Sequence, residues 1–459
     1  MTPPKPGPAP PPDPEGLASL LPLALVVVLA SAAIGLTGGA FRLAVGQVTH
    51  WILAAYTSAQ AVAGWTGFAG VWALSMTLTA LPLWGVLRLA PQAAGSGIPR
   101  VESLWLGELE PAHNFWLMPV KFLGGVLALA SGHALGREGP MVQMGATIGI
   151  YLGRTCRLSA RDARHLLAAS AGAGLAVAFS APLGGVLFTL EELTRSATAR
   201  LVIASALACA VAVAVGQLLV GSAPVFQIVV PSVGPQFLPL YAVLGILAGG
   251  VGLAYNRLVL VMLREMTAVP PVWRVLGSSL LLALVMWQLP FISGNGETIN
   301  QLVLDHAFGL GALSLLLLTR FLFGPFSYAV GLPGGLFAPM LAVGALLGAI
   351  FAELGMTLWP GLKLPVSAFA VVGMAAFFSA TVRAPLTGVV LIIEMTGASN
   401  LTLPLLLACL PAALVPFWLG DKSLYEELRE RQLQVHRARV AEGLASQGGA
   451  LGSAGGEGR

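Results

Sequence analysis

Glu138 is the residue of this sequence whose type and setting most clearly suggest chemistry. It stands in Gly136-Arg137-Glu138-Gly139-Pro140, directly before an apolar stretch at 141–152. Proline suits the first turn of a helix, and glycine lets backbone amides approach a ligand closely. The segment therefore predicts a helix N-terminus, whose unpaired N–H groups and positive dipole end attract an anion. An ionised Glu138 would fill such a site and would leave it on protonation. The alternative is that Glu138 only caps its helix or pairs with Arg137.

Two further segments have the same proline-marked helix start. They are Gly95-Ser96-Gly97-Ile98-Pro99 and Gly334-Gly335-Leu336-Phe337-Ala338-Pro339. Ser96 adds a hydroxyl that can donate to an anion, whereas the apolar side chains at 336 and 337 leave only backbone N–H groups. For each proline alone, a kink or a loop is the alternative. Neutral donors of this kind hold an anion weakly enough to release it, which favours halide or nitrate.

These helix starts belong to a pattern that occurs twice, which indicates two copies of one unit. Gly95-Ser96-Gly97 recurs as Gly294-Asn295-Gly296, and Gly136-x-x-x-Pro140 recurs as Gly335-x-x-x-Pro339, each 199 positions later. Apolar repeats interrupted by Gly and Pro in corresponding places are typical of transporters, whose sites lie at the repeat interface.

The repeat also helps to assign roles to the charged residues that interrupt apolar sequence. Lys121 and Arg320 correspond to each other, and we expect them to set the background potential or lock helices rather than touch an ion. Glu191 corresponds to Glu394, which favours an architectural role. Its neighbour Glu192 has no acidic counterpart and is the better candidate for a proton relay, with ordinary solvation at the interface as the alternative.

The composition places the chain in a bilayer. Apolar residues make up 56% of 459 positions and charged residues only 10%, which excludes a water-soluble domain of this size. Stretches of spanning length occur near 17–40, 65–90, 115–135, 200–220, 236–263, 275–292, 308–330 and 401–419. The stretches at 141–152 and 340–353 are too short to cross unaided.

Charge and composition also predict the domain organisation. Residues 1–16 form a Pro-rich, disordered tail, residues 17–425 a membrane transport domain with repeats at about 17–220 and 236–425, and residues 426–459 a tail without a second folded domain. Basic clusters at 154–164, 195–200, 264–274 and after 422 predict that these segments and both termini are cytoplasmic. No basic stripe with interleaved aromatics indicates nucleic-acid binding, and no metal-ligand or cofactor motif is present in the sequence.

The three helix-start motifs, in this order and spacing, resemble those of the chloride channel/transporter (CLC) family, in particular its bacterial proton-coupled members. The resemblance covers about residues 20–430. It implies an all-α polytopic membrane protein, built as an inverted repeat of two halves with broken, tilted helices. It also implies a homodimer in which each subunit has its own anion pathway. The nucleotide-binding domains of many eukaryotic members are missing.

The resemblance assigns a role to each site residue. Central chloride is held by the turn of Ser96, Gly97 and Ile98, by the amides of Leu336 and Phe337, and by the hydroxyl of Tyr425. The outer site uses amides of Arg137, Glu138 and Gly139, with help from the segment of Phe337 and Ala338. Glu138 matches the external gate and proton acceptor, and Glu192 matches the internal proton-transfer position, with Glu102 as its neighbour.

These features predict a chloride/proton antiporter of a bacterial inner (plasma) membrane, with nitrate and bromide as alternative anions. The nearest alternative is a passive voltage- or pH-gated chloride channel. An intramembrane enzyme is disfavoured because Gly-x-Ser-x-Gly and His-Glu-x-x-His are absent from the sequence. A cation-coupled solute carrier is a third alternative, which sodium dependence of uptake would distinguish.

Overall fold

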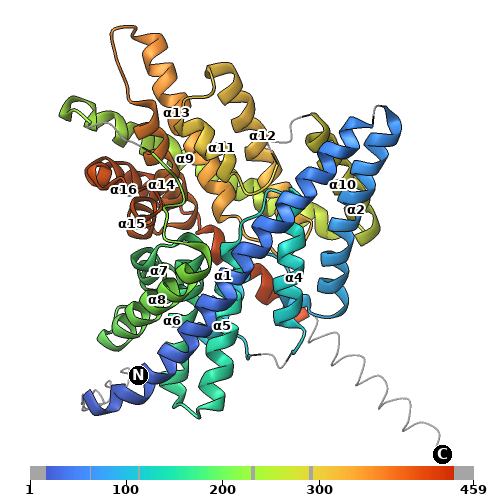
Figure 1. Ribbon diagram of the computed structural model, residues 1–459. Helices are drawn as coiled ribbons and strands as arrows, with labels where there is room; N and C mark the ends of the chain where they lie inside the picture. Colours follow the sequence, from blue (N-terminus) through green and yellow to red (C-terminus); the bar gives the residue numbers. More distant parts are fainter. Residues whose placement is uncertain (1–16, 63, 112–113, 229–232, 289–292, 439–459) are drawn as a thin grey trace, which may run out of the picture.

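The computed structural model describes residues 17–62, 64–111, 114–228, 233–288 and 293–438, which form helices joined by turns (Figure 1). The first half contains α1 (Leu17–Ala61), α2 (Trp65–Arg88), η1 (Pro91–Ala93), α3 (Ile98–Leu106), α4 (Leu117–Ala130), α5 (Glu138–Thr155), α6 (Ala160–Phe179), α7 (Pro182–Phe188), η2 (Thr189–Leu193) and α8 (Ala199–Val220). The second half contains η3 (Pro235–Phe237), α9 (Leu238–Ala268), α10 (Pro271–Gln288), α11 (Glu297–Leu304), α12 (Leu310–Ala329), α13 (Phe337–Leu358), α14 (Val366–Val382), α15 (Pro385–Thr396), η5 (Ser399–Leu401) and α16 (Thr402–Trp418).

A further helical segment, residues 424–438, follows α16. The predicted boundary between transport domain and tail, at 425/426, therefore falls inside a helix. This helix packs against the body of the protein, where Arg431 donates to the carbonyl of Leu263. The predicted tail at 1–16 and the rest of the C-terminal tail, from 439, lie outside the described residues.

Within the described part of the chain, eight helices are long and apolar enough to cross a membrane, as the prediction of an all-α polytopic membrane protein requires. They are α1, α2, α8, α9, α10, α12, α13 and the η5–α16 segment.

Three predicted segments have the wrong length. The helix expected at 17–40 continues to Ala61 as α1, which has 45 residues. The segment 340–353 belongs to α13, which has 22 residues and is of spanning length. The stretch at 115–135 forms only the 14-residue helix α4.

The two copies predicted from the sequence correspond in three dimensions. α5 packs along α6, and their counterparts α13 and α14 pack in the same way. A Cβ atom at Gly145 would lie 2.4 Å from the Ser170 carbonyl oxygen, and one at the equivalent Gly344 would lie 2.4 Å from that of Gly373. Small residues are therefore required at both helix contacts, as is common in membrane helix packing.

The two copies meet in opposite orientations. Gly136 and Gly335, which are equivalent residues, form an antiparallel bridge, so a local two-fold axis passes between them. α5 and α13 accordingly extend from the middle of the molecule toward opposite ends (Figure 1).

Glu191 and Glu394 bind the two copies together. The Glu394 carboxylate accepts hydrogen bonds from the amides of Leu183 (3.0 Å) and Gly184 (2.7 Å) at the start of α7. Glu191 accepts from the amides of Leu386 (3.1 Å) and Thr387 (2.7 Å) at the start of α15. Each carboxylate satisfies orphan N–H groups and the dipole of a helix in the other copy. This confirms the architectural role predicted for Glu191.

Candidate anion and proton site

The three proline-marked helix starts meet and are hydrogen-bonded to one another. The Gly95 amide donates to Leu332 O (3.0 Å), and the Gly334 amide donates to Gly95 O (3.1 Å). Gly136 and Gly335 exchange two backbone bonds, of 2.7 and 2.8 Å. The first turns of α3, α5 and α13 are thereby held side by side in the interior. The three helix starts therefore meet at the interface of the two copies, where the sequence analysis expects a transport site.

The Glu138 side chain is fully buried at this junction, where it accepts a hydrogen bond from the Phe337 amide to Oε1 (2.9 Å). The carboxylate thus occupies the position where the first N–H groups of α13 would bind an anion. Arg137 pairs elsewhere, with Glu297, at 2.8 Å. Neither alternative raised for Glu138, a cap on its own helix alone or a pair with Arg137, describes this arrangement.

Two glycines make room for that carboxylate. A Cβ at Gly335 would lie 2.3 Å from Glu138 Oε1, and a Cβ at Gly136 would lie 2.1 Å from Oε2. Real Cβ atoms do not approach oxygen so closely, so any larger residue would displace Glu138. A Cβ at Gly139 would in turn lie 2.7 Å from Ser96 Oγ, which places the serine next to the start of α5.

The Ser96 turn presents its hydroxyl at this junction. Gly97 has a φ of 85°, a left-handed conformation that favours glycine, and the Ile98 amide donates to Ser96 Oγ (3.4 Å). Because the oxygen accepts that bond, its own O–H remains able to donate. The Ser96 amide hydrogen-bonds the buried phenol of Tyr328, a residue that the sequence analysis missed. No motif marks Tyr328, since its role depends on how α12 packs against the turn.

Tyr425 comes from the 424–438 helix and is completely buried. No described residue hydrogen-bonds its hydroxyl, and the phenol interacts electrostatically with Glu138 and Glu192. A buried hydroxyl without a partner is unfavourable unless a ligand accepts its proton. The hydroxyl is therefore available to an ion between the two carboxyl groups.

The Phe337 side chain forms one wall of the site, and its amide donates to Glu138. Its ring packs against Phe179 (centroids 4.9 Å apart) and Phe378 (4.3 Å). Leu336, the N-cap residue of α13, is fully buried, and Ala338 is 4% exposed. The polar groups of this wall are therefore backbone N–H groups, as predicted.

Lys121 and Arg320 hold the two glycine turns. Lys121 Nζ donates to the carbonyls of Gly95 (2.7 Å) and Ala93 (3.1 Å). Arg320 donates to the carbonyls of Gly294 (2.6 Å), the equivalent of Gly95 in the second copy, and of Ser293 (3.2 Å). Both cations are buried, and their contacts confirm the predicted locking role.

Glu192 lies in the π-helical turn η2, which follows α7. The side chain is 3% exposed, and no described group hydrogen-bonds Oε1. The alternative interpretation, that Glu192 is simply solvated at the membrane interface, is therefore wrong. π-Turns inside helices often mark functional sites.

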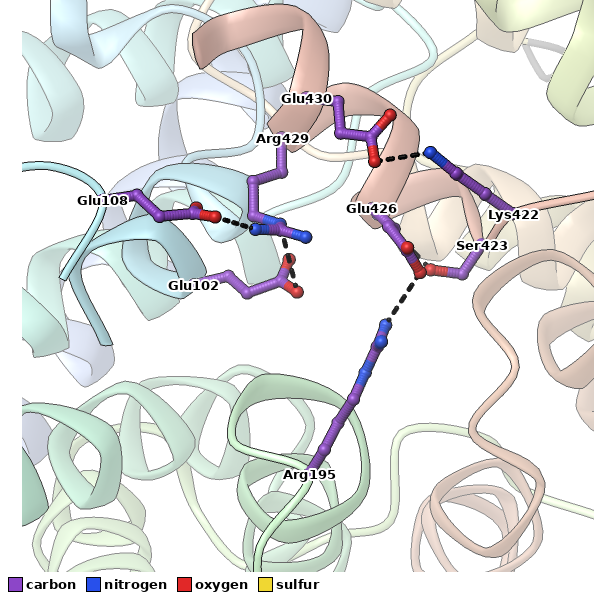
Figure 2. A network of polar contacts seen from close by, with 8 residues as sticks. All are labelled: Glu102, Glu108, Arg195, Lys422, Ser423, Glu426, Arg429 and Glu430. Carbon is purple, nitrogen blue, oxygen red and sulfur yellow. Dashed lines mark hydrogen bonds and ion pairs between the residues drawn. The ribbon is translucent and has the colours of Figure 1, made fainter. Parts of the chain in front are cut away.

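Figure 2 shows a network of charged residues, three of which, Glu102, Arg195 and Glu426, interact electrostatically with Glu192. Glu102, which is buried, pairs with Arg429 Nε at 3.4 Å, and Arg429 Nη1 also contacts Glu108 at 2.5 Å. Arg195 reaches Glu426 from the opposite side, at 3.3 Å. Arg429 and Glu426 both come from the 424–438 helix. That helix therefore carries Tyr425 and also contributes to the ion pairs around Glu102. The sequence analysis missed Arg429, because nothing in a charged C-terminal stretch indicates which arginine points inward.

The sequence matches a family model described as "Voltage gated chloride channel" over residues 76–416. Among curated proteins, it is 37% identical over 422 residues to the H(+)/Cl(-) exchange transporter ClcA of Salmonella typhimurium, covering 89% of this chain and 88% of the relative. The corresponding protein of Klebsiella pneumoniae is 37% identical over 439 residues, covering 93% and 91%.

Solved structures agree with the sequence comparisons. A slow cyanobacterial Cl⁻/H⁺ antiporter superposes with a TM-score of 0.84 at 30% identity, covering 90% of this chain and 98% of that one. A eukaryotic CLC transporter superposes with a TM-score of 0.77 at 25% identity, covering 91% and 75%. The matched motifs, the relatives and the fold together show that this chain belongs to the voltage-gated chloride channel (CLC) family, whose members include transporters.

Proposed function

We propose that this protein exchanges chloride for protons across a membrane, with Glu138 acting alternately as gate and proton acceptor. One observation carries the proposal. The Glu138 carboxylate accepts the Phe337 amide hydrogen at the start of α13, where an anion would otherwise bind. An ionised carboxylate and a chloride ion therefore compete for the same donors.

Protonation reverses this competition. A neutral carboxyl group is a weaker acceptor for positively polarised N–H groups than a carboxylate. When Glu138 takes up a proton, it gives up the donors and chloride occupies them. Because the anion and the proton move in opposite directions, every cycle moves net charge in one direction and is electrogenic.

The donors around Glu138 form the proposed anion path. Central chloride is bound by the hydroxyls of Ser96 and Tyr425, by the amides of Leu336 and Phe337, and by the turn of Gly97 and Ile98. The outer position uses the amides of Arg137, Glu138, Gly139 and Ala338. Support comes from the joined helix starts and from the unpaired, buried hydroxyl of Tyr425. Nitrate and bromide are further candidate ions.

Glu192 is the proposed inner proton-transfer group. It is buried, its Oε1 has no hydrogen-bond partner among the described residues, and Glu102 lies within electrostatic range. A proton that enters through the cluster of Glu102 and Glu192 would reach Glu138 beside Tyr425, without entering the outer anion position.

We also propose the setting of the protein. The basic segments at 154–164 and after 422 support a cytoplasmic location of those ends and of both termini. The bacterial relatives support a bacterial plasma membrane. The family resemblance implies a homodimer, which chemical crosslinking in native membranes would test.

Reconstituted vesicles provide the test of exchange. An outward chloride gradient is expected to drive protons into vesicles that contain the wild-type protein, against their own gradient. Glu138→Gln is expected to retain chloride flux and to lose proton uptake, because its amide cannot carry the proton.

Two results would contradict the proposal. Wild-type chloride flux without proton movement would favour the passive channel. Full chloride-driven proton uptake by Glu138→Gln would remove Glu138 from the proton path.

A further inference from the structure

A pocket of about 410 Å³ lies beside Arg137, and neither Tyr425 nor Glu192 lines it. Five segments line it: α1, the end of α4, the turn before α5, α10 through Met286, and residues 293–298 before and in α11. Its polar lining includes Arg42, Thr49, Arg137, Asn295, Glu297 and Thr298. None of the roles assigned to the central path explains Arg42 or Glu297.

Two cationic side chains and one anionic side chain line the pocket. Arg137 donates from Nε to Ala178 O (2.9 Å) and pairs with Glu297 through Nη2 (2.8 Å). Arg42 donates from Nη1 to Val177 O (3.0 Å) and Ser180 Oγ (2.7 Å). The two arginines thus hold the end of α6 and face the same space, with a net charge of one positive unit when Glu297 is ionised.

Arg42 retains donors for a ligand. A guanidinium carries five N–H groups, and no described residue accepts from Arg42 other than through Nη1. Both Arg137 and Glu297 act on Arg42 electrostatically. The charge of Glu297 therefore affects whatever binds to either arginine.

The wall behind the pocket adds positive charge. Buried Arg320 holds the carbonyls of Ser293 and Gly294, which line the pocket, and so its guanidinium stands directly behind them. Apolar side chains, among them Leu53, Leu129 and Met286, line the remainder. A mixed, partly dry and cationic pocket suits a small, weakly hydrated monovalent anion better than a phosphate or a carboxylic acid.

We propose that this pocket is an antechamber that binds a chloride ion before it reaches the Glu138 position, and that Glu297 limits its occupancy. The ion pair with Glu297 neutralises much of the charge of Arg137, which keeps binding weak enough for release toward the central path. Arg42 supplies the uncompensated charge. The inference rests on the proposed transport of chloride and adds a further binding site and a residue that sets its affinity.

Glu297→Gln tests the inference because it removes the negative charge and keeps the size of the side chain. The current is measured in planar bilayers while chloride is varied on one side only, at constant ionic strength. The KM for chloride is expected to fall about three- to tenfold, as a unit charge several ångströms from an ion predicts after screening. The change is expected on one side of the bilayer only.

Three further variants separate charge from structure. Arg42→Gln is expected to raise the KM on the same side, opposite to Glu297→Gln, and a folding defect does not produce opposite shifts. Glu297→Asp keeps the charge and is expected to stay close to the wild type. Glu353→Gln removes the same charge from α13, outside the pocket lining, and is the matched control.

The outcomes distinguish the two proposals. A wild-type chloride current with no shift in Glu297→Gln, or with the same shift in Glu297→Asp or Glu353→Gln, overturns the antechamber and leaves the exchange mechanism intact. A wild-type protein without any chloride current overturns the proposed function, and the antechamber with it.

Discussion

The Phe337 amide donates to the carboxylate of Glu138 across 199 positions of sequence, the same separation that relates the two copies of the repeat. Phe337 stands at the place in the second copy that Glu138 holds in the first. Glu138, the proposed gate in the first half, is thus hydrogen-bonded by the backbone of Phe337, the equivalent residue of the second half. Because that counterpart is apolar, its amide hydrogen is free to bind either the carboxylate or an anion.

Chloride flux is expected to depend on pH through Glu138. The ionised side chain blocks its own donors and the neutral side chain releases them, so wild-type flux rises as the pH falls. In Glu138→Gln the flux is expected to be high and nearly independent of pH, because no proton binds at that position. Chloride efflux from vesicles at a series of symmetric pH values measures both. A pH profile in the variant equal to that of the wild type would place the titrating group elsewhere.

Glu192→Gln is expected to reduce chloride-driven proton uptake by about tenfold or more while chloride flux continues. The amide occupies the same buried space in η2 but cannot carry a proton. Proton and chloride fluxes measured on the same vesicles give their ratio. An unchanged ratio would show that protons reach Glu138 by another route.

The Glu191 and Glu394 caps are expected to contribute to stability rather than to transport chemistry. Glu191→Ala and Glu394→Ala each leave two helix-start amides without their acceptor, which costs about 1–3 kcal/mol. Thermal unfolding in detergent should therefore begin at a lower temperature for both variants. The ratio of chloride to protons is expected to stay at the wild-type value at temperatures where the variants remain folded. A changed ratio in Glu191→Ala would assign Glu191 to the proton path.

Arg429→Ala is expected to lower both thermal stability and chloride affinity. The substitution leaves buried Glu102 without its cation and loosens the helix that positions Tyr425. Arg437→Ala, an exposed position of the same helix, is the control. Chloride titration of the purified variants by calorimetry measures the affinity. Wild-type affinity in Arg429→Ala would show that Tyr425 holds its position without this anchor.

The repeat explains why so much of the site could be predicted from the sequence. Proline and glycine mark where helices begin, and the repeat indicates which beginnings belong together, so Ser96, Glu138 and Phe337 were found without any structure. The same comparison separated Glu191 from Glu192. Local residue types determine these features, and the sequence displays them directly.

The missed residues depend on contacts that no local pattern indicates. Arg42 interrupts apolar sequence and would have been a candidate, but the predicted span ended at residue 40, before it. The helix instead continues through Gly38 to Ala61, and a Cβ atom at Gly38 would lie 2.6 Å from Met141 and 2.7 Å from Val177. Glu297 occupies the repeat position of Ile98, and only the packing of α11 beside the start of α5 reveals its partner Arg137.

The backbone bonds between Gly136 and Gly335, and between Gly95 and its partners, also limit how the molecule can move. Rotation of one half relative to the other would break these buried backbone hydrogen bonds, and no water in the membrane interior would replace them. Such a scaffold favours turnover by the rotation of single side chains within a nearly stationary frame, and it disfavours rocking of whole halves.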